Sequence, residues 1–114
     1  MTTIETGLLL GTELRTPLLH LVRRIHGSLV ANGINDLRPA HFTVFQVISE
    51  SGLRSTELAE KARMTKQSMG ALVEYLEARG YVERVNDPRD GRARIVRLTD
   101  RGWEIVTIAR LCIV

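Results

Sequence analysis

The length, composition and charge of the chain narrow both its architecture and its range of functions. With 114 residues, 44% hydrophobic and 25% charged, it suits one soluble, α-rich domain with a modest core. The single cysteine excludes an internal disulfide and fits a reducing cytoplasm. Because the sequence has no apolar run long enough to span a bilayer and no secretion signal at its N-terminus, we expect a cytoplasmic protein without membrane contact.

The net charge of +3 is concentrated in one stretch. Residues 79–101 contain seven arginines and four acidic residues, whereas the rest of the chain is neutral overall. A solvated surface is the simpler explanation for such a stretch. Its position beside a helix-turn-helix pattern, described below, instead favours a phosphate-bearing partner.

The first third of the chain is expected to be helical. From Gly7 to about Asn32 the apolar residues recur at helical spacing. They form one broad face: Leu14, Leu18, Leu21, Val22, Ile25 and Leu29. Pro17 either restarts this helix or kinks one long helix. Leu8–Leu10 lie outside the stripe and need separate cover. A second, strongly apolar helix is predicted from Pro39 to about Glu50.

A short helix and a turn come next. Ser55 is expected to cap a helix from Thr56 to Ala62, with Glu57 complementing the helix dipole in its first turn. Arg63–Thr65 then forms a turn. So short a turn between two helices predicts a helix-turn-helix.

The second helix of this pair is predicted from Lys66 to Arg79. Thr65 can cap its first turn, and Gly80 can end it with a positive φ. The apolar stripe comprises Met69, Leu72, Val73 and Leu76. The opposite side carries only polar or small residues: Lys66, Gln67, Ser68, Gly70 and Ala71. This surface can approach a partner closely, and its hydrogen-bonding groups lie at the N-terminal end.

A β-hairpin is predicted after this helix. The β-prone runs Tyr81–Val85 and Ala93–Leu98 flank residues 86–92, a loop rich in turn formers. Leu53–Arg54 can add a brief strand, and the alternation of the second run leaves Ile95 on the wrong face. A helix-turn-helix followed by a hairpin predicts a winged helix-turn-helix fold, mainly α with a small β-hairpin wing, of a kind suited to binding DNA.

The final helix is expected to begin at a cap formed by Thr99 or Asp100. From Trp103 onward it is apolar nearly all round, more than one small domain can cover. We therefore expect a homodimer joined through both chain ends. The predicted organisation is an N-terminal helical segment contributing to dimerisation at 1–36, the winged helix at 37–98 and a C-terminal dimerisation helix at 99–114.

Several motifs together resemble the multiple-antibiotic-resistance regulator (MarR) family. They are Ser55-Thr56-Glu57-Leu58-Ala59, Thr65-Lys66-Gln67-Ser68-Met69, Leu76-Glu77-Ala78-Arg79-Gly80-Tyr81-Val82-Glu83-Arg84, Asp87-Pro88-Arg89-Asp90-Gly91-Arg92 and Leu98-Thr99. The similarity covers about Leu37 to Ile108. It implies a bacterial winged-helix dimer, mostly of repressor type, in a family many of whose members are released from operators by phenolic ligands or by cysteine oxidation.

The sequence departs from the family pattern in two places. Many members have Thr-Arg where this chain has Gly70-Ala71, which removes a longer donor from the recognition helix. The family also continues into a further helix that interlocks the dimer, whereas this chain stops at Val114. We therefore expect the C-terminal dimerisation helix to be truncated.

Ten residues are candidates for contact with DNA. They are Ser55, Thr56, Thr65, Lys66, Gln67, Ser68, Ala71, Arg89, Arg92 and Arg94. Those at the helix N-terminus suit phosphate anchoring and base-edge readout, although an ordinary exposed helix cap would look similar. In the wing we expect Arg89 and Arg94 to touch DNA. Arg92 should divide its role between DNA and an ion pair with Asp87 or Asp90, since in this family an Asp–Arg pair is thought to shape the wing.

The resemblance also implies a ligand crevice between the first two helices and the DNA-binding lobe. His20, His41 and Phe45 are its candidate residues, although core packing is the preferred role for Phe45. The histidines lack metal-ligand spacing, so neither a metal nor a cofactor is expected. For Cys112, with apolar neighbours, a buried inert thiol is favoured over an oxidant sensor.

The function predicted from these features is sequence-specific regulation of transcription. The chain should bind double-stranded DNA as a homodimeric repressor on a palindromic operator, with a small-molecule effector as a further partner. The alternative is a winged helix that contacts proteins without DNA. An enzyme is not expected, because the sequence has no P-loop, dinucleotide glycine motif, Cys/His cluster or nucleophile–base pair.

Overall fold

The computed structural model of the chain describes residues 12–113, with side chains described from residue 19 to residue 112. The chain divides into two compact units. One contains the described residues up to Leu37 together with residues 108–113, and the other is Arg38–Thr107. The predictions for the helix start at Gly7, for Leu8–Leu10 and for Val114 lie outside the described residues.

The first unit is built on one long helix, α2 (Thr12–Ala31). The helix continues through position 17, so it does not restart there. It ends at Ala31, close to the predicted end at about Asn32. Gly33 follows with a φ of +83°, and its N–H donates to the carbonyl of Val30 at 2.9 Å. The N–H of Ile34 returns to the carbonyl of Leu29 at 2.8 Å, and Leu29 is completely buried.

The second unit begins with α3 (Pro39–Val47), which is shorter than predicted. The sequence pattern extended this helix to about Glu50, but Ile48 is extended, with φ −72° and ψ 137°. The reason lies at Gly52, with φ +90°, where an added Cβ would lie 2.7 Å from the carbonyl oxygen of Val96. The chain must leave the helix early to bring this glycine against the hairpin.

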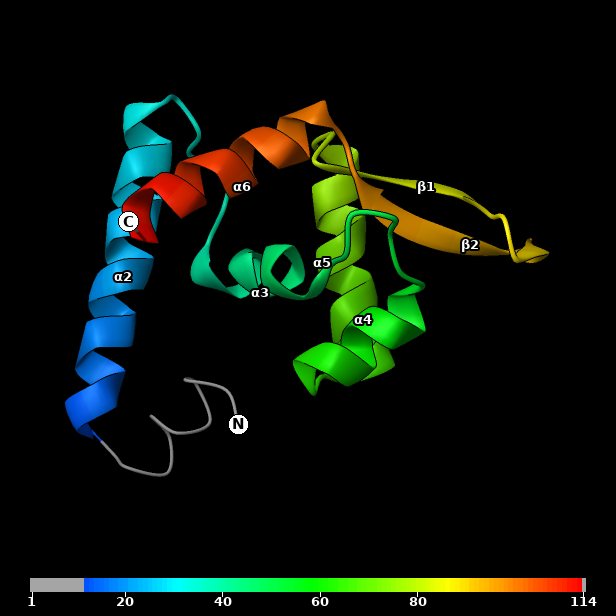
Figure 1. Cartoon of the computed structure of the whole chain (residues 1–114), viewed down its shortest axis with the longest axis horizontal. Helices are drawn as coiled ribbons and strands as arrows, with labels where there is room; N and C mark the ends of the chain where they lie inside the picture. Colours follow the sequence, from blue (N-terminus) through cyan, green and yellow to red (C-terminus); the bar gives the residue numbers. More distant parts are fainter. Residues whose placement is uncertain (1–11, 114) are drawn as a thin grey trace. The chain divides into compact units, whose positions relative to one another are not determined.

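The hairpin pairs β1 (Val82–Asp87) with β2 (Asp90–Leu98) in antiparallel register, and Figure 1 shows it extending from the helices of its unit as an arm. Only Pro88 and Arg89 lie between the strands, so the predicted seven-residue loop is wrong. Pairing shifts between Asn86, opposite Arg94, and Asp87, opposite Asp90. The strands therefore extend through residues whose composition predicted a loop, because an irregularity in the register absorbs the extra residues of β2.

The predicted brief strand before the helix-turn-helix is confirmed at Leu53. Its N–H and carbonyl bond to the backbone of Val96 at 3.0 and 2.7 Å. This pairing also accounts for Ile95, whose side chain is only 6% exposed. The segment at Gly52 passes close to the δ-carbon of Ile95. The side of the hairpin that carries Ile95, which the sequence pattern placed away from the core, is therefore covered by this loop.

The last helix, α6 (Asp100–Ile113), begins at a cap formed by Thr99. The Thr99 hydroxyl accepts a hydrogen bond from the N–H of Gly102 at 3.2 Å and donates one to the carbonyl of Gly80. These bonds connect the start of α6 to Gly80, which follows the helix that precedes the hairpin. None of the helices within residues 12–113 is long and apolar enough to cross a bilayer.

The core of the second unit draws on every element from α3 to the start of α6. Its best buried side chains are at most 2% exposed: Val44, Leu58, Met69, Val73, Leu76, Tyr81, Val82, Val96 and Ile105. Fully burying one such side chain contributes roughly 1.5–3 kcal/mol. The winged helix-turn-helix fold predicted from the sequence is therefore confirmed as a packed unit.

Candidate DNA-binding interface

The helix-turn-helix is formed by α4 (Ser55–Ala62) and α5 (Lys66–Ala78). The turn depends on Arg63, which adopts the left-handed conformation with φ 56° and ψ 45°. The N–H of Met64 then reaches the carbonyl of Ala59 at 2.9 Å. Ala59 is 2% exposed, so its small side chain is enclosed in this packing. The predicted turn at residues 63–65 is confirmed.

The predicted cap of α4 is wrong in detail. Ser55 is the first helical residue, and Arg54 occupies the N-cap position. Glu57 supplies the capping bond, because its Oε1 accepts from the backbone N–H of Arg54 at 2.9 Å. Ser55 is half-buried and Thr56 is exposed, so the first turn of α4 still presents a hydroxyl to solvent.

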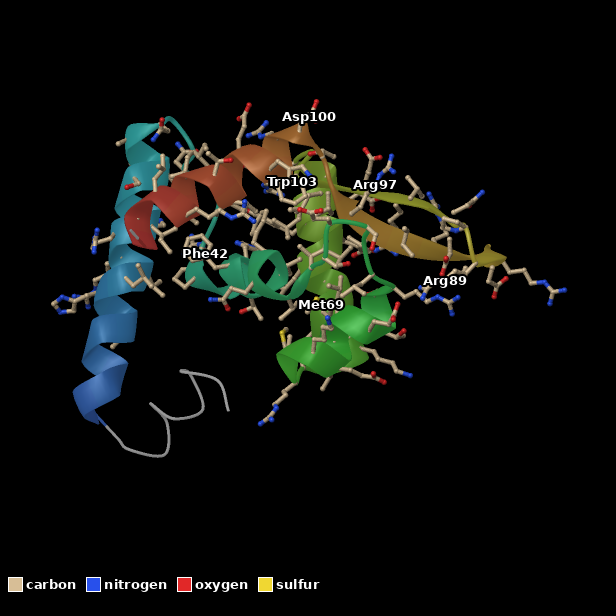
Figure 2. The ribbon with its side chains drawn as sticks, in the orientation of Figure 1. Phe42, Met69, Arg89, Arg97, Asp100 and Trp103 are labelled. Carbon is tan, nitrogen blue, oxygen red and sulfur yellow. The ribbon has the colours of Figure 1, made fainter. Side chains whose placement is uncertain are left out.

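The N-terminus of α5 is open and polar. The Thr65 hydroxyl oxygen accepts from the N–H of Ser68 at 3.0 Å, as predicted, and its proton is donated to the Ser68 hydroxyl at 2.9 Å. The exposed side chains here are those of Thr65, Lys66, Gln67, Ser68 and Ala71. Figure 2 labels Met69 on the same helix, whose side chain is completely buried. The helix therefore anchors itself through one face and leaves its positive dipole end accessible.

The tip of the wing is organised around a buried carboxylate. The Asp87 side chain is 1% exposed and accepts bonds from two arginines. Arg54 donates from Nε to Oδ2 at 3.0 Å, and its Nη2 forms an ion pair with the same oxygen at 3.0 Å. Arg89 donates its backbone N–H to Oδ1 at 2.9 Å, its Nε to Oδ1 at 3.2 Å and its Nη2 to Oδ2 at 3.2 Å.

The sequence-based assignment of the pairing role to Arg92 is therefore corrected: the side chains that pair with Asp87 are those of Arg54 and Arg89. Arg92 donates only its backbone N–H, to Asp90 at 3.0 Å. Only Pro88 separates Arg89 from Asp87, so their side chains meet locally, whereas Arg92 lies in the stretch of β2 that the register shift displaces. Figure 2 shows Arg89 near the end of the hairpin.

Hydrogen bonding lowers the pKa of Asp87 from 3.8 to about 2. The largest cause is the hydrogen bond from the Arg89 side chain, followed by that from the Arg89 backbone N–H. The hydrogen bond from the Arg54 side chain lowers the pKa further. Because the folded-state pKa lies below the unfolded-state value, the stabilisation is complete above about pH 4 and is lost as the pH falls toward 2. The cluster is therefore charged and intact at neutral pH.

This pKa shift gives a test of the cluster in acid. The unfolding free energy of the wild-type chain should exceed that of Asp87→Asn by a constant amount near neutral pH. The difference should shrink as the pH falls from about 4 toward 2, since both side chains are then uncharged. Urea unfolding of the two proteins at several pH values measures it, and a difference independent of pH would contradict the role of the Asp87 charge.

The remaining wing arginines differ in how much of their charge is neutralised. Arg97 pairs with Glu83 across the hairpin at 2.7 Å, and Arg84 lies 3.4 Å from Glu77. Arg94 donates from Nη2 to the carbonyl of Arg84 at 2.8 Å. Among the described residues, no acidic side chain lies within ion-pair distance of Arg92 or Arg94, and both are exposed. These two cations carry the unneutralised charge of the wing.

The structure does not bring the three candidate ligand residues into one described pocket. Nδ1 of His41 accepts from the N–H of Arg38 at 2.8 Å, and its buried ring stacks on Tyr75 with centroids 4.2 Å apart. Phe45 packs edge-on against Tyr81. His20 is exposed and belongs to the other unit. Helix capping and packing thus account for His41 and Phe45.

A groove of about 560 Å³ lies within the first unit. It is lined by Arg24, Gly27, Ser28, Ala31, Asn32, Ile108, Leu111 and Cys112. The Cys112 thiol is buried, as predicted, and lies 3.2 Å from the Ser28 hydroxyl. Within the part of the chain that the structure describes, no group of three or more His, Cys, Asp or Glu side chains could hold a metal ion.

The helix pair α4 and α5, followed by the hairpin of β1 and β2, makes this a winged helix-turn-helix protein. The MarR family model matches residues 35–93, and transcriptional regulator HosA of Escherichia coli O111:H- is 31% identical over 100 residues, covering 84% of this chain and 74% of HosA. The chain therefore belongs to the MarR family and is a transcriptional regulator, not an enzyme.

Solved structures agree with this assignment. Regulator Tm0710 from Thermotoga maritima is 31% identical, with a TM-score of 0.68, over 86% of this chain and 68% of Tm0710. The repressor CouR bound to a 23-mer DNA duplex is 26% identical, with a TM-score of 0.65, over 99% of this chain and 78% of CouR. CouR from Rhodococcus jostii RHA1 has also been solved with p-coumaroyl-CoA, at 24% identity and a TM-score of 0.67, over 88% of this chain and 69% of that one.

The sequence analysis did not identify Arg54 as a partner of Asp87 at the wing tip. Its partner Asp87 is 33 residues away, so no local spacing connects them. One sequence signal pointed to Arg54 as the N-cap. Glu57 follows it by three residues, the spacing at which a glutamate side chain accepts a hydrogen bond from the N-cap N–H.

Proposed function

We propose that this chain is a sequence-specific, double-stranded-DNA-binding repressor that acts as a homodimer on a palindromic operator. The observation that carries the proposal is the pairing, within one compact unit, of an open polar N-terminus on α5 with a wing bearing unneutralised arginines. In this arrangement α5 enters the major groove and the wing reaches the adjacent minor groove or its flanking phosphates.

Each candidate residue then has a role. Lys66 and the hydroxyls of Ser55, Thr56, Thr65 and Ser68 anchor phosphates, while Gln67 reads a base edge and Ala71 permits close approach. Arg92 and Arg94 supply the free cations of the wing. Arg89 shares its charge with Asp87 and contributes mainly through the shape of the turn. The DNA-bound structure of the related repressor CouR supports this reading.

Assembly and regulation form the second part of the proposal. A twofold dimer places two α5 helices about one DNA turn apart, so the operator is an inverted repeat. A small-molecule effector would modulate binding, as the ligand-bound CouR structure supports for the fold. His20, His41 and Phe45 remain sequence-based candidates for its site. A cytoplasmic location follows from action on DNA in a bacterial cell.

Salt dependence tests the proposed role of the wing. Arg92→Ala should weaken binding to every duplex and reduce the slope of log affinity against log salt by about 0.9, because one phosphate contact is lost. Arg97→Ala is the matched control, since its guanidinium already pairs with Glu83. Fluorescence anisotropy between about 50 and 200 mM salt measures both. If the wild-type chain shows no salt-dependent duplex binding, the protein-contact alternative replaces this proposal.

Sequence discrimination tests the proposed role of α5. Gln67→Ala should cost about 1–3 kcal/mol on the preferred operator and much less on unrelated DNA, because a base-edge contact is lost. Lys66→Ala serves as the comparison and should weaken all sequences similarly. Competition binding with operator and scrambled duplexes measures the ratio. An equal loss on both duplexes would make Gln67 a phosphate contact and not a reader of bases.

A further inference from the structure

The wing tip is connected to the start of α4 by a cluster of five charged side chains, Arg54, Glu57, Asp87, Arg89 and Asp90. Asp87 accepts from Arg54 and Arg89, as described above. Glu57 lies 3.9 Å from Nη2 of Arg89 and also accepts the backbone N–H of Arg54. Oδ2 of Asp90 lies 3.9 Å from Nη2 of Arg54 and adds a third carboxylate. Three carboxylates thus face two arginines, so the cluster has no net attraction for phosphate.

Arg54 occupies the junction of this cluster. Its backbone is held by Glu57 in the first turn of α4, and its side chain forms a hydrogen bond and an ion pair with Asp87 at the end of β1. Arg54 is therefore held through its backbone on the helix-turn-helix and through its guanidinium on the wing. A buried carboxylate bonded in this way resists displacement, because losing a partner would leave charge unpaired inside the protein.

We propose that Arg54 is a positioning residue for DNA binding, holding the turn of the wing at a set distance from α4 and α5. This inference rests on the proposed DNA-binding function. Through Asp87, Arg54 fixes the turn at Pro88 and Arg89, and this turn positions Arg92, an exposed cation three residues after Arg89. The competing role is a direct phosphate contact by Arg54, whose side chain is 38% exposed.

The first arm of the test uses the free protein and needs no DNA. In Arg54→Ala the backbone N–H of Arg89, which donates to Asp87, should exchange with solvent about tenfold faster than in the wild type. Arg54→Lys should fall between the two, because an ammonium keeps the charge but cannot reproduce the planar contact of the guanidinium with Asp87. Arg97→Ala, an arginine paired on the same hairpin, should leave this exchange rate unchanged. NMR measures the exchange and also shows whether each variant is folded.

The second arm is a double-mutant cycle on duplex binding. If Arg54 acts through the wing, Arg54→Ala should lower affinity about tenfold alone but much less in an Arg92→Ala background. Equal losses in both backgrounds would make Arg54 an independent phosphate contact and overturn the proposal. Unchanged exchange of the Arg89 N–H in Arg54→Ala would also overturn it. If the wild type bound no duplex, the proposed function would fail, while the exchange arm would still decide whether Arg54 holds the wing.

Discussion

Replacing Gly102 with alanine should destabilise the second unit by about 3 kcal/mol or more, the largest stability effect we expect from one methyl group. Gly102 lies in the first turn of α6 and is buried. An added Cβ would overlap the carbonyl oxygen of Tyr81 and lie 3.0 Å from a methyl carbon of Leu98. The carbonyl cannot rotate away easily, because it already accepts the N–H of Thr99 at 3.1 Å.

A matched glycine separates this clash from the general effect of adding alanine to a helix. Gly27 lies in α2, and an added Cβ there would have no atom within 4 Å. Gly27→Ala should therefore stabilise the chain by about 0.5–1 kcal/mol, because alanine loses less backbone entropy on folding. Urea unfolding midpoints of the two variants should move in opposite directions. Similar midpoints would mean that α6 can shift away from Tyr81.

Replacing Leu111 with glutamate should have the largest effect on function, through assembly. Leu111 is 72% exposed on the last turns of α6, and Leu19 and Val30 on α2 are 53% and 48% exposed. A charge on an exposed leucine costs the isolated chain little, but it would be buried in a dimer formed through this face. We expect a shift to monomer and a loss of about 100-fold or more in operator affinity, since two half-sites are no longer bound together.

Sedimentation at micromolar concentration and anisotropy on full and half operators measure this outcome. Thr107→Glu is the control, because it adds the same charge to the same helix at an exposed polar position. That variant should remain dimeric and keep its affinity. An unchanged dimer in Leu111→Glu would place the interface elsewhere. A wild-type monomer that bound one full palindrome tightly would overturn the dimer model.

Much of the local structure could be predicted because its causes lie within a few residues. The Thr65 cap, the end of α5 at Gly80 and the buried face of that helix all depend on contacts between neighbours in the chain. The same holds for the two-helix unit and for the family resemblance, since the motifs that carry it are contiguous. These features were sufficient to establish the class of protein.

The errors arose where a distant segment decided the local outcome. The residues after Val47 have a helical pattern, yet α3 ends because Gly52 must approach the backbone of Val96. Residues 86–92 have the composition of a loop, yet most of them belong to strands because pairing across the hairpin continues past Asn86. Hydrogen bonding to a partner strand outweighs local turn preference in such cases.

The sequence by itself determined that this chain forms a winged helix-turn-helix with a polar recognition surface and a basic hairpin. Only the tertiary structure decided which arginines remain free. Arg54 and Arg89 pair with the carboxylates of Asp87, Asp90 and Glu57, and Arg97 pairs with Glu83. Arg92 and Arg94 have no acidic partner among the described residues. The physical reason is that an ion pair depends on distance in space, and the fold brings Arg54 to Asp87 across 33 positions of the chain.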